Sequence, residues 1–361
     1  MSFAPRHRHT DMEQTDQAAV AAATAGDEAA FSALVARHRH ELQVHCYRML
    51  GSLEDAEDAL QDTLLAAWRG LGAFEGRASL RTWLYQVATR RCLDARRAAA
   101  RRPAKAWDVP HVQPPEPTRL GEVVWLQPYP DALLDGLPAT PPGPEARYEL
   151  AESVSLAFVT ACQLLPPRQL AVLVLRDVLG FPAAEVAGML GISVDAANSA
   201  LKRARAGLQR SRCAEPLAGS RAEGAVVATA EGMASAGAPV EAGVVARFVR
   251  AWEAADVAGL VDLLTDDVFM SMPPMPFEYH GRDAVARFSM TLFAAGRRFD
   301  LVPTRANGQA AFGAYLRAPT GLRHGVGLYV LGLRADRISA LTRFESSMLP
   351  RFGLPRSLPM R

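Results

Sequence analysis

The sequence predicts a multidomain chain in which two all-α modules are followed by an α+β domain. Apolar residues recur at spacings of three and four through residues 27–97 and again through residues 164–208, which is typical of helices. Beyond residue 240, two further helical patterns precede a series of short strand patterns, which indicates an α+β domain. The length of 361 residues allows about two or three domains.

These patterns divide the chain into seven segments. We predict a mobile N-terminal tail, a first helical module, a proline-rich linker with a docking segment, a second helical module, a flexible linker, an α+β domain and a C-terminal tail, at residues 1–26, 27–103, 104–144, 145–212, 213–239, 240–350 and 351–361. The linker at 104–144 carries too many prolines for a continuous helix or a central strand. Its stretch 123–135 is too apolar for a free linker, so we expect it to dock on a surface; a buried loop of one domain is the alternative.

Composition excludes several kinds of site and location. The net formal charge is only +2, so the distribution of charge is more informative than its sum. The four cysteines are single and far apart, which predicts neither a zinc site nor a disulfide framework and favours a reducing cytoplasm: Cys46, Cys92, Cys162 and Cys213. No apolar run reaches eighteen residues, so we expect no membrane span and no signal peptide. The histidine pairs at 7/9 and 38/40 are spaced by two, which places them on different helix faces, and we predict no metal and no cofactor.

The first module pairs an acidic helix with a basic one. Asp27 is the predicted N-cap of an opening helix that continues to about Leu50, and Ser52 is the predicted N-cap of the acidic helix. The apolar face of the acidic helix consists of Ala56, Leu60, Thr63, Leu64, Ala67 and Leu71. Its acids lie off that face and favour the positive end of the helix dipole.

The basic helix has the opposite charge. Ser79 is its predicted N-cap, and the inner face consists of Leu80, Leu84, Val87, Ala88 and Ala95. The opposite side is predicted to carry Thr82, Gln86, Thr89, Arg90 and Arg97. Nine basic residues and one acid lie between Gly76 and Lys105, a density that favours binding to a polyanion.

The first module closely resembles region two of the extracytoplasmic-function group of sigma-70 family transcription initiation factors. The resemblance lies in the run from Asp55 to Thr63, in Trp68 and Phe74, and in the run from Leu80 to Tyr85. The resemblance implies that the acidic helix binds core RNA polymerase through Asp55, Glu57, Asp58, Gln61 and Asp62. It implies that the loop captures a base flipped from the melted promoter and that the basic helix recognises the minus-ten element, through Phe74, Arg77, Arg81, Gln86, Thr89, Arg90 and Arg97. Physical chemistry agrees, because a flipped base needs an aromatic or apolar pocket and a nearby positive surface. A solvated acidic face and a loop phenylalanine that packs beneath its own loop are the alternatives.

The second module has a helix-turn-helix pattern. A proline-started apolar helix over 164–176 is followed by a short helix over 180–190, a turn at Gly191, and a third helix capped by Ser193 and running to about Leu208. Its inward residues are Ala197, Leu201, Ala204 and Leu208, and the outer surface consists of Asp195, Ala196, Asn198, Ser199, Lys202, Arg203 and Arg205. Short polar residues followed by bases suit a helix in the major groove. The module resembles sigma region four, which implies recognition of the minus-thirty-five element; many such factors have Thr-Val-Lys-Ser where this chain has Ala196-Ala-Asn-Ser199, so no base preference is carried over. A trihelical protein-binding module is the alternative.

The C-terminal domain is predicted to contain helices at 244–255, 257–264 and 283–293 and strands at 268–272, 299–306, 309–316, 323–333 and 337–344. With the run from Glu278 to Phe288, it resembles the SnoaL-like cone fold of polyketide cyclases, and the tryptophan-led stretch at 123–135 resembles sigma factors that bear this extension. The resemblance implies an apolar cavity, for which the candidate lining is Trp252, Phe269, Met272, Met275, Tyr279, His280 and Phe288, although such residues are more often core. The acids Asp256, Asp266, Asp267, Glu278 and Asp283, with His280, have no spacing that demands catalysis, so we predict no catalytic residues.

The resulting hypothesis is a promoter-specific transcription initiation factor, not an enzyme, whose SnoaL-like domain regulates its activity. Its predicted partners are core RNA polymerase and promoter DNA, both duplex and melted single strand, with an intramolecular contact between the SnoaL-like domain and the sigma modules and no membrane contact. The alternatives are a SnoaL-like enzyme or ligand sensor fused to a DNA-binding module without sigma activity, and a DNA-binding repressor that does not contact polymerase.

Overall fold

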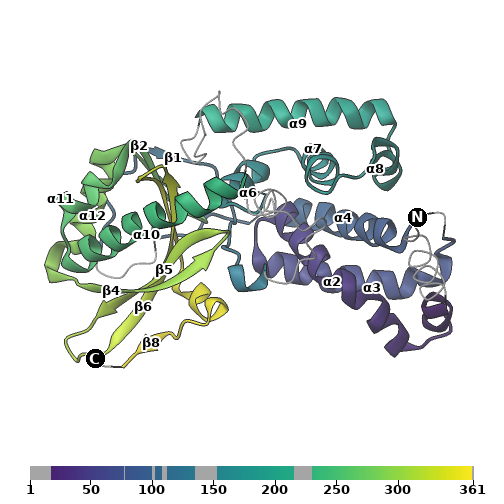
Figure 1. Ribbon diagram of the computed structural model, residues 1–361, viewed down its shortest axis with the longest axis horizontal. Helices are drawn as coiled ribbons and strands as arrows, with labels where there is room; N and C mark the ends of the chain where they lie inside the picture. The colour runs from purple at the N-terminus through teal and green to yellow at the C-terminus, as the bar shows by residue number, and fades with distance from the viewer. Residues whose placement is uncertain are drawn as a thin grey trace, which may run out of the picture. The chain divides into compact units, whose positions relative to one another are not determined.

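The computed structural model describes residues 18–76, 78–99, 102–107, 112–134, 153–214 and 230–359 (Figure 1). The chain forms two compact units. We call Met1–Ala100 with Pro166–Lys202 the helical unit, and Arg101–Leu165 with Arg203–Arg361 the sheet unit. Both units are therefore built from segments that are discontinuous in sequence.

The helical unit contains a three-helix bundle formed by α2 (Glu28–Leu50), α3 (Leu53–Gly70) and α4 (Leu80–Ala99). A short 3-10 turn, η1 (Leu71–Ala73), follows α3. All three predicted N-caps are confirmed: the Asp27 carboxylate accepts from two backbone amides at 2.9 and 3.0 Å, and the hydroxyls of Ser52 and Ser79 each accept one, at 3.2 and 3.0 Å. Residues 18–24, within the predicted mobile tail, are helical.

The bundle core contains the predicted apolar face of α3, with Ala56, Leu60 and Ala67 buried. One prediction for α4 is wrong. Thr89 does not lie on the outer side of the helix but is fully buried, and its hydroxyl lies 2.9 Å from Nε2 of His45. A buried imidazole needs a hydrogen-bond partner, and the bundle supplies it from the helix opposite.

The remainder of the helical unit is the helix-turn-helix segment. It consists of α7 (Pro167–Leu173), a π-helical turn η3 (Val174–Val178), α8 (Ala183–Leu190) and the first part of α9 (Val194–Ala214). Gly191 adopts φ +64° and ends α8, as a left-handed C-cap requires. The Ser193 hydroxyl accepts from the Ala196 amide at 3.1 Å, which confirms the predicted cap. Helix α8 begins three residues later, and α9 ends six residues later, than the sequence predicts.

The sheet unit is built on an eight-stranded sheet whose order is β1-β3-β2-β7-β6-β5-β4, with β8 paired to β6. The strands are β1 (Arg119–Leu120), β2 (Leu264–Met272), β3 (Met275–His280), β4 (Phe299–Ala306), β5 (Gln309–Arg317), β6 (Arg323–Arg334), β7 (Arg337–Phe344) and β8 (Ser357–Leu358). Among the strand pairs that the structure describes, only β2–β7 is parallel. All five predicted strands are present, and β1, β3 and β8 were not predicted.

Three helices cover one face of this sheet: α10 (Ala230–Ala254), α11 (Val257–Asp262) and α12 (Arg282–Phe293). The core between helices and sheet is rich in aromatic residues and includes Phe248, Trp252, Phe288, Tyr279 and Tyr329. Helix α10 begins at Ala230, inside the stretch predicted as a flexible linker. A shorter helix, α6 (Leu156–Gln163), is capped by the Ser155 hydroxyl, which accepts from Phe158 at 3.2 Å. None of the helices that the structure describes is both apolar enough and long enough for a membrane span.

The proline-rich linker is attached to the sheet along its described length. Strand β1 pairs antiparallel with β3, and η2 (Asp131–Leu133) follows a bridge between Pro130 and Ala306. Tyr129 is fully buried, and its backbone amide donates to the Asn307 side chain at 2.8 Å. The Asn307 amide group in turn donates to the Val154 carbonyl at 2.6 Å, so one buried side chain holds both the linker and the segment that leads into α6.

Candidate polymerase and nucleic-acid interface

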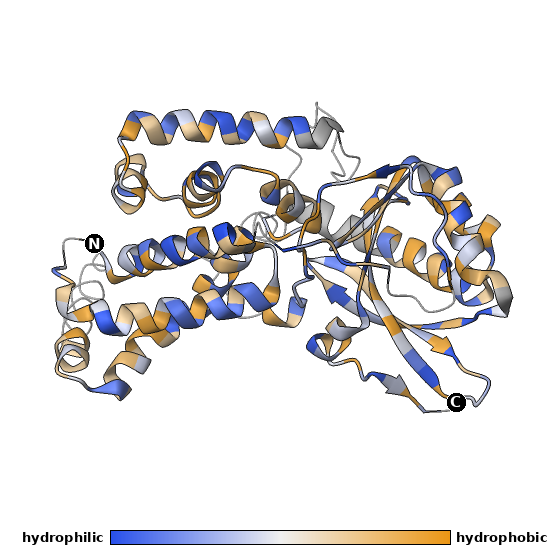
Figure 2. Ribbon diagram, turned by 180° about the vertical axis from the view of Figure 1, so that it is seen from behind, coloured by the Kyte–Doolittle hydropathy of each residue, from blue (hydrophilic) through white to orange (hydrophobic). Residues whose placement is uncertain are grey.

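The exposed residues of α9 form the predicted surface for duplex DNA. Ala197, Leu201 and Ala204 are buried. All seven predicted surface residues are exposed: Asp195, Ala196, Asn198, Ser199, Lys202, Arg203 and Arg205. Figure 2 shows hydrophilic residues along α9 interspersed with apolar ones. The prediction that Leu208 packs fully inward is only partly met, because this side chain is half-buried.

The basic residues of α4 lie in two different environments. Arg90 and Arg97 are exposed, and Arg97 pairs with Asp94 on the same helix at 2.9 Å. Gln86 is half-buried, whereas Arg81 donates through Nε to the Glu41 carboxylate at 3.0 Å. Arg77 lies outside the described residues. The structure therefore leaves Arg90 and Arg97 exposed on the C-terminal half of α4, whereas Arg81 on the N-terminal half is engaged.

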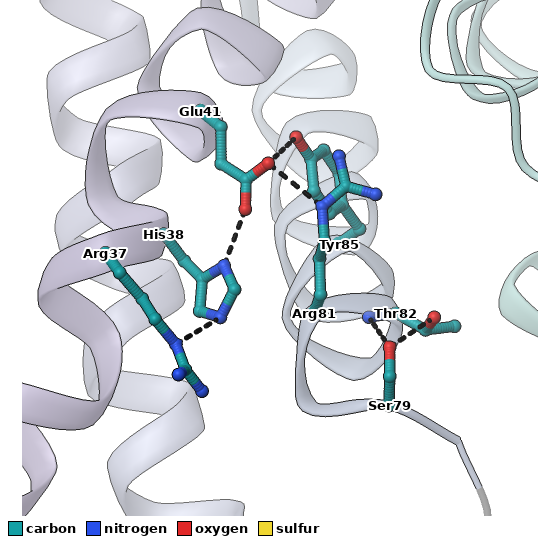
Figure 3. A network of polar contacts seen from close by, with 7 residues as sticks. All are labelled: Arg37, His38, Glu41, Ser79, Arg81, Thr82 and Tyr85. Atoms are coloured by element: carbon teal, nitrogen blue, oxygen red, sulfur yellow. Dashed lines mark hydrogen bonds and ion pairs between the residues drawn. The ribbon is translucent and has the colours of Figure 1, made fainter. Parts of the chain in front are cut away.

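Glu41 is the centre of a polar network between α2 and α4 that the sequence did not predict (Figure 3). One carboxylate oxygen lies 2.6 Å from Nδ1 of His38, and the other accepts from Arg81 and from the Tyr85 hydroxyl, the latter at 3.2 Å. Burial alone would raise the pKa of the Glu41 carboxyl, but hydrogen bonds from His38 and Arg81 and the Arg81 charge lower it overall. The carboxylate is thus held in its charged form. The only sequence signal was the spacing of three between His38 and Glu41.

The helix-turn-helix segment contacts the N-terminal half of α4. The Phe181 ring lies 5.2 Å from the Tyr85 ring at 65°, and the Arg81 guanidinium lies 5.2 Å from the Phe181 ring centroid. The Thr82 hydroxyl donates to Glu185 of α8 at 3.1 Å. In this conformation, part of the predicted minus-ten surface is therefore covered by the second helical module.

The loop after α3 carries the candidate base-capturing residue. Phe74 is half-buried, and its ring centroid lies 5.2 Å from that of Trp83 of α4. The Phe74 ring is therefore neither fully exposed nor fully buried beneath its own loop. On α3 itself, Asp58, Gln61 and Asp62 are exposed, whereas Asp55 and Glu57 are half-buried.

The predicted ligand-pocket residues do not share one cavity. Trp252, Met272, Tyr279 and Phe288 lie in the core between sheet and helices. Phe269 and His280 are directly paired across β2 and β3 and lie on the opposite face, with ring centroids 4.7 Å apart. The prediction of a single pocket was wrong because neighbouring residues of a strand point to opposite faces of a sheet.

A cavity of about 290 Å³ lies on that opposite face. Its lining combines strand residues with linker residues and includes Arg119, Leu120, Val124, Phe269, Met275 and Glu278. Met275 is the only predicted pocket residue besides Phe269 among its lining residues.

The acids of this domain have structural partners. Asp266 pairs with Arg282 at 3.1 Å, Asp267 pairs with Arg334 at 2.8 Å, and Asp256 caps α11. Glu278 is ion-paired with Arg119 of the linker and lies 3.3 Å from Nε2 of His280. The arrangement is typical of ion pairs that hold a fold together.

Three family models match the chain: Sigma-70 region 2 over residues 34–102, Sigma-70 region 4 over 155–208, and the SnoaL-like domain over 245–338. The ECF RNA polymerase sigma factor SigG of Mycobacterium tuberculosis is 41% identical over 333 residues, which cover 91% of this chain and 85% of the relative. SigM of the same organism is 33% identical over 211 residues, covering 58% of this chain and 88% of the relative.

A solved structure has the same overall fold. The crystal structure of SigJ of Mycobacterium tuberculosis matches with a TM-score of 0.54 at 23% identity, covering 87% of this chain and 95% of that one. These similarities confirm the predicted fold class and sigma function and do not favour a SnoaL-like enzyme fused to a DNA-binding module without sigma activity. The chain belongs to the ECF RNA polymerase sigma factors and carries a SnoaL-like domain after its two sigma-70 regions.

Proposed function

We propose that this sigma factor binds core RNA polymerase through α3, recognises the minus-ten element through α4 and the loop before it, and recognises the minus-thirty-five element through α9. In the same proposal the SnoaL-like domain regulates these activities and the protein acts in the cytoplasm. The observation that carries the proposal is the exposed face of α9, on which all seven residues predicted to contact the minus-thirty-five element lie.

The face of α9 supports duplex binding by its order of residue types. Asn198 and Ser199 precede Lys202 and Arg203, so that short polar side chains lie nearer the N-terminus and cations lie nearer the C-terminus. In a helix placed in the major groove, the former reach base edges and the latter reach phosphates. Lys202→Ala should weaken binding about equally on all sequences, whereas Asn198→Ala should change the sequence preference.

For the minus-ten element, the proposal assigns DNA contact to Phe74, Gln86, Arg90 and Arg97. Phe74 and Trp83 place two aromatic rings beside the basic helix. Stacking of a base on such a ring contributes about 1–3 kcal/mol, which offsets the few kcal/mol of unstacking the base from the duplex. Thr89 is omitted from this set because it is fully buried.

For polymerase, the proposal assigns contact to the exposed acids of α3. Asp58 and Asp62 are spaced by four, so they lie on the same helix face. Charge complementarity at such a face controls the rate and specificity of association.

The test is reconstitution of the full chain with core RNA polymerase, followed by sequencing of the transcript starts. Asp58→Lys should weaken co-purification with polymerase and reduce the number of discrete starts. Asp336→Lys, which reverses another exposed acid, in the turn between β6 and β7, is the matched control and should leave both unchanged. Equal behaviour of the two variants would refute the assignment of α3, and absence of discrete starts with the unmodified chain would refute the function.

A further inference from the structure

We propose that the mouth of the SnoaL-like core is a binding site for a small planar aromatic molecule of about the size of indole, and that Trp107 of the chain's own linker occupies this site as an exchangeable internal ligand. The stretch of linker around Trp107 would then be bound or released according to whether such a molecule is present, while the linker from β1 onward stays attached to the sheet.

The first observation is the position of the Trp107 ring. It lies 6.3 Å from the ring of Phe277 on β3 and 6.2 Å from that of Phe288 on α12, centroid to centroid. It is half-buried and packs against the same apolar core that contains Trp252 and Tyr279. The site is therefore complementary to an indole ring, and a residue 170 or more positions away along the chain supplies that ring.

The second observation concerns charge. The guanidinium of Arg343, a residue only 4% exposed on β7, lies 5.9 Å from the Trp107 ring centroid. A cation next to a ring face favours an aromatic occupant over an aliphatic one, by about 0.5–2 kcal/mol in general. The same cation disfavours a positively charged ligand. The chemistry of the site thus selects an aromatic molecule that is neutral or anionic.

The third observation is how Trp107 is held. Its indole N–H donates to the Val112 carbonyl at 2.6 Å, a partner in the same linker. That bond can move with the stretch of linker around Trp107, so this stretch loses mainly ring packing and the cation–π contact when the ring leaves, while β1 stays paired with β3. A ligand can replace both. The neighbouring ion pair between Lys105 and Glu345, 2.5 Å, is half-exposed on the lysine side and adds little to retention.

The exchange has a defined energetic basis. A tethered side chain competes at an effective concentration in the millimolar range, so a free aromatic molecule must exceed that concentration or bind more tightly than Trp107 does. Removing the indole of Trp107 removes the competitor and leaves the walls in place. Binding of the free molecule should then become at least tenfold tighter.

The experiment measures indole binding to the full chain by calorimetry and by the shift in thermal midpoint. Trp107→Ala should bind indole at least tenfold more tightly than the unmodified chain, and its midpoint should rise with indole concentration. Trp125→Ala is the matched control, because it removes the same side chain from the same linker at a position outside the core mouth. Cyclohexanol should bind Trp107→Ala more weakly than phenol, which has the same size and the same hydroxyl.

A second measurement uses the unmodified fold and does not depend on the alanine variant being stable. In protein labelled with 5-fluorotryptophan, the Trp107 resonance is identified by its absence in Trp107→Phe. Indole should shift that resonance and leave the Trp125 resonance in place. No shift up to the solubility limit of indole, together with equal binding by Trp107→Ala and Trp125→Ala, would overturn the proposal.

These experiments measure binding alone, so their outcome does not depend on whether the proposed sigma function is correct. The regulatory consequence does rest on the proposed function: the linker that holds Trp107 begins directly after α4, the helix assigned to the minus-ten element. Indole that binds without changing transcription would retain the site and remove the regulatory role.

Discussion

Lowering the pH from 7.5 to 5.0 should destabilise the helical unit through His45. This imidazole is fully buried and lies 2.9 Å from the Thr89 hydroxyl. Its Nδ1 is buried with no hydrogen-bond partner among the described residues, so a second proton would find no acceptor there. Burial, and then the charges of Arg48 and Arg81, lower the pKa of His45 to about 3, and Glu41 opposes this only partly.

The sign and size follow from linkage. The unfolded imidazole has a pKa of 6.5, so between pH 6.5 and about 3 the unfolded state takes up a proton that the folded state does not. The stabilising effect is complete above pH 6.5 and is lost progressively as the pH falls towards 3. At pH 5.0 the pH lies about 1.5 units below the unfolded pKa. At about 1.36 kcal/mol per unit, this lowers the free energy of unfolding by about 2 kcal/mol.

Hydrogen exchange of the α2 and α4 amides is the appropriate assay, because a multidomain chain need not unfold in one step. The control is His45→Gln, which keeps a polar side chain near Thr89 but does not titrate. Between pH 7.5 and 5.0, the free energy of opening of these helices should fall by about 2 kcal/mol more in the unmodified chain than in this variant. Equal losses would show that His45 is not the titrating group and would refute the burial argument.

Two further predictions concern the attachment of the linker to the sheet. Asn307→Ala should lower the free energy of unfolding of the sheet unit by about 2–4 kcal/mol, because it leaves two buried backbone groups unpaired and places alanine at a φ of +57°; denaturant unfolding and proteolysis of the linker measure this. Gly121→Ala should cost about 1–3 kcal/mol, because the added methyl would overlap the ion-paired side chain of Glu278. Gly243→Ala, in α10 of the same unit, adds a methyl that meets no described atom within 4 Å and should be neutral or stabilising in the same assay.

The local features of the helical modules could be predicted from the sequence because they depend on neighbouring residues. Asp27, Ser52, Ser79 and Ser193 each bond a backbone amide two or three residues ahead, and all four caps are present. The exposed face of α9 was predicted for the same reason, since helical periodicity alone decides which of its residues face outward. That face is also the part of the candidate site whose placement the sequence predicted most fully.

Features that depend on distant partners could not be predicted. Thr89 has a polar side chain at an outward-looking position of the helical pattern, yet its partner His45 lies 44 residues away. Strand β1 has two residues, too few for an alternating pattern, and it exists because the edge of β3 pairs with it. Trp107 likewise carries no sequence signal that its ring would lie near those of Phe277 and Phe288.

The contacts of α4 decide how much of the proposed DNA-binding surface is available without rearrangement. Arg90 and Arg97 are exposed, but Arg81 and Thr82 contact Phe181 and Glu185 of the second sigma module. If α4 recognises the minus-ten element along its whole length, these contacts must be lost. One hydrogen bond, one aromatic pair and one cation–π contact together correspond to about 1.5–5 kcal/mol. That range is comparable to the stacking of one or two captured bases, about 1–3 kcal/mol each. Unstacking those bases from the duplex costs a few kcal/mol of its own, so base capture alone does not offset the separation of the two modules, and the phosphate contacts of the exposed arginines of α4 must contribute the remainder.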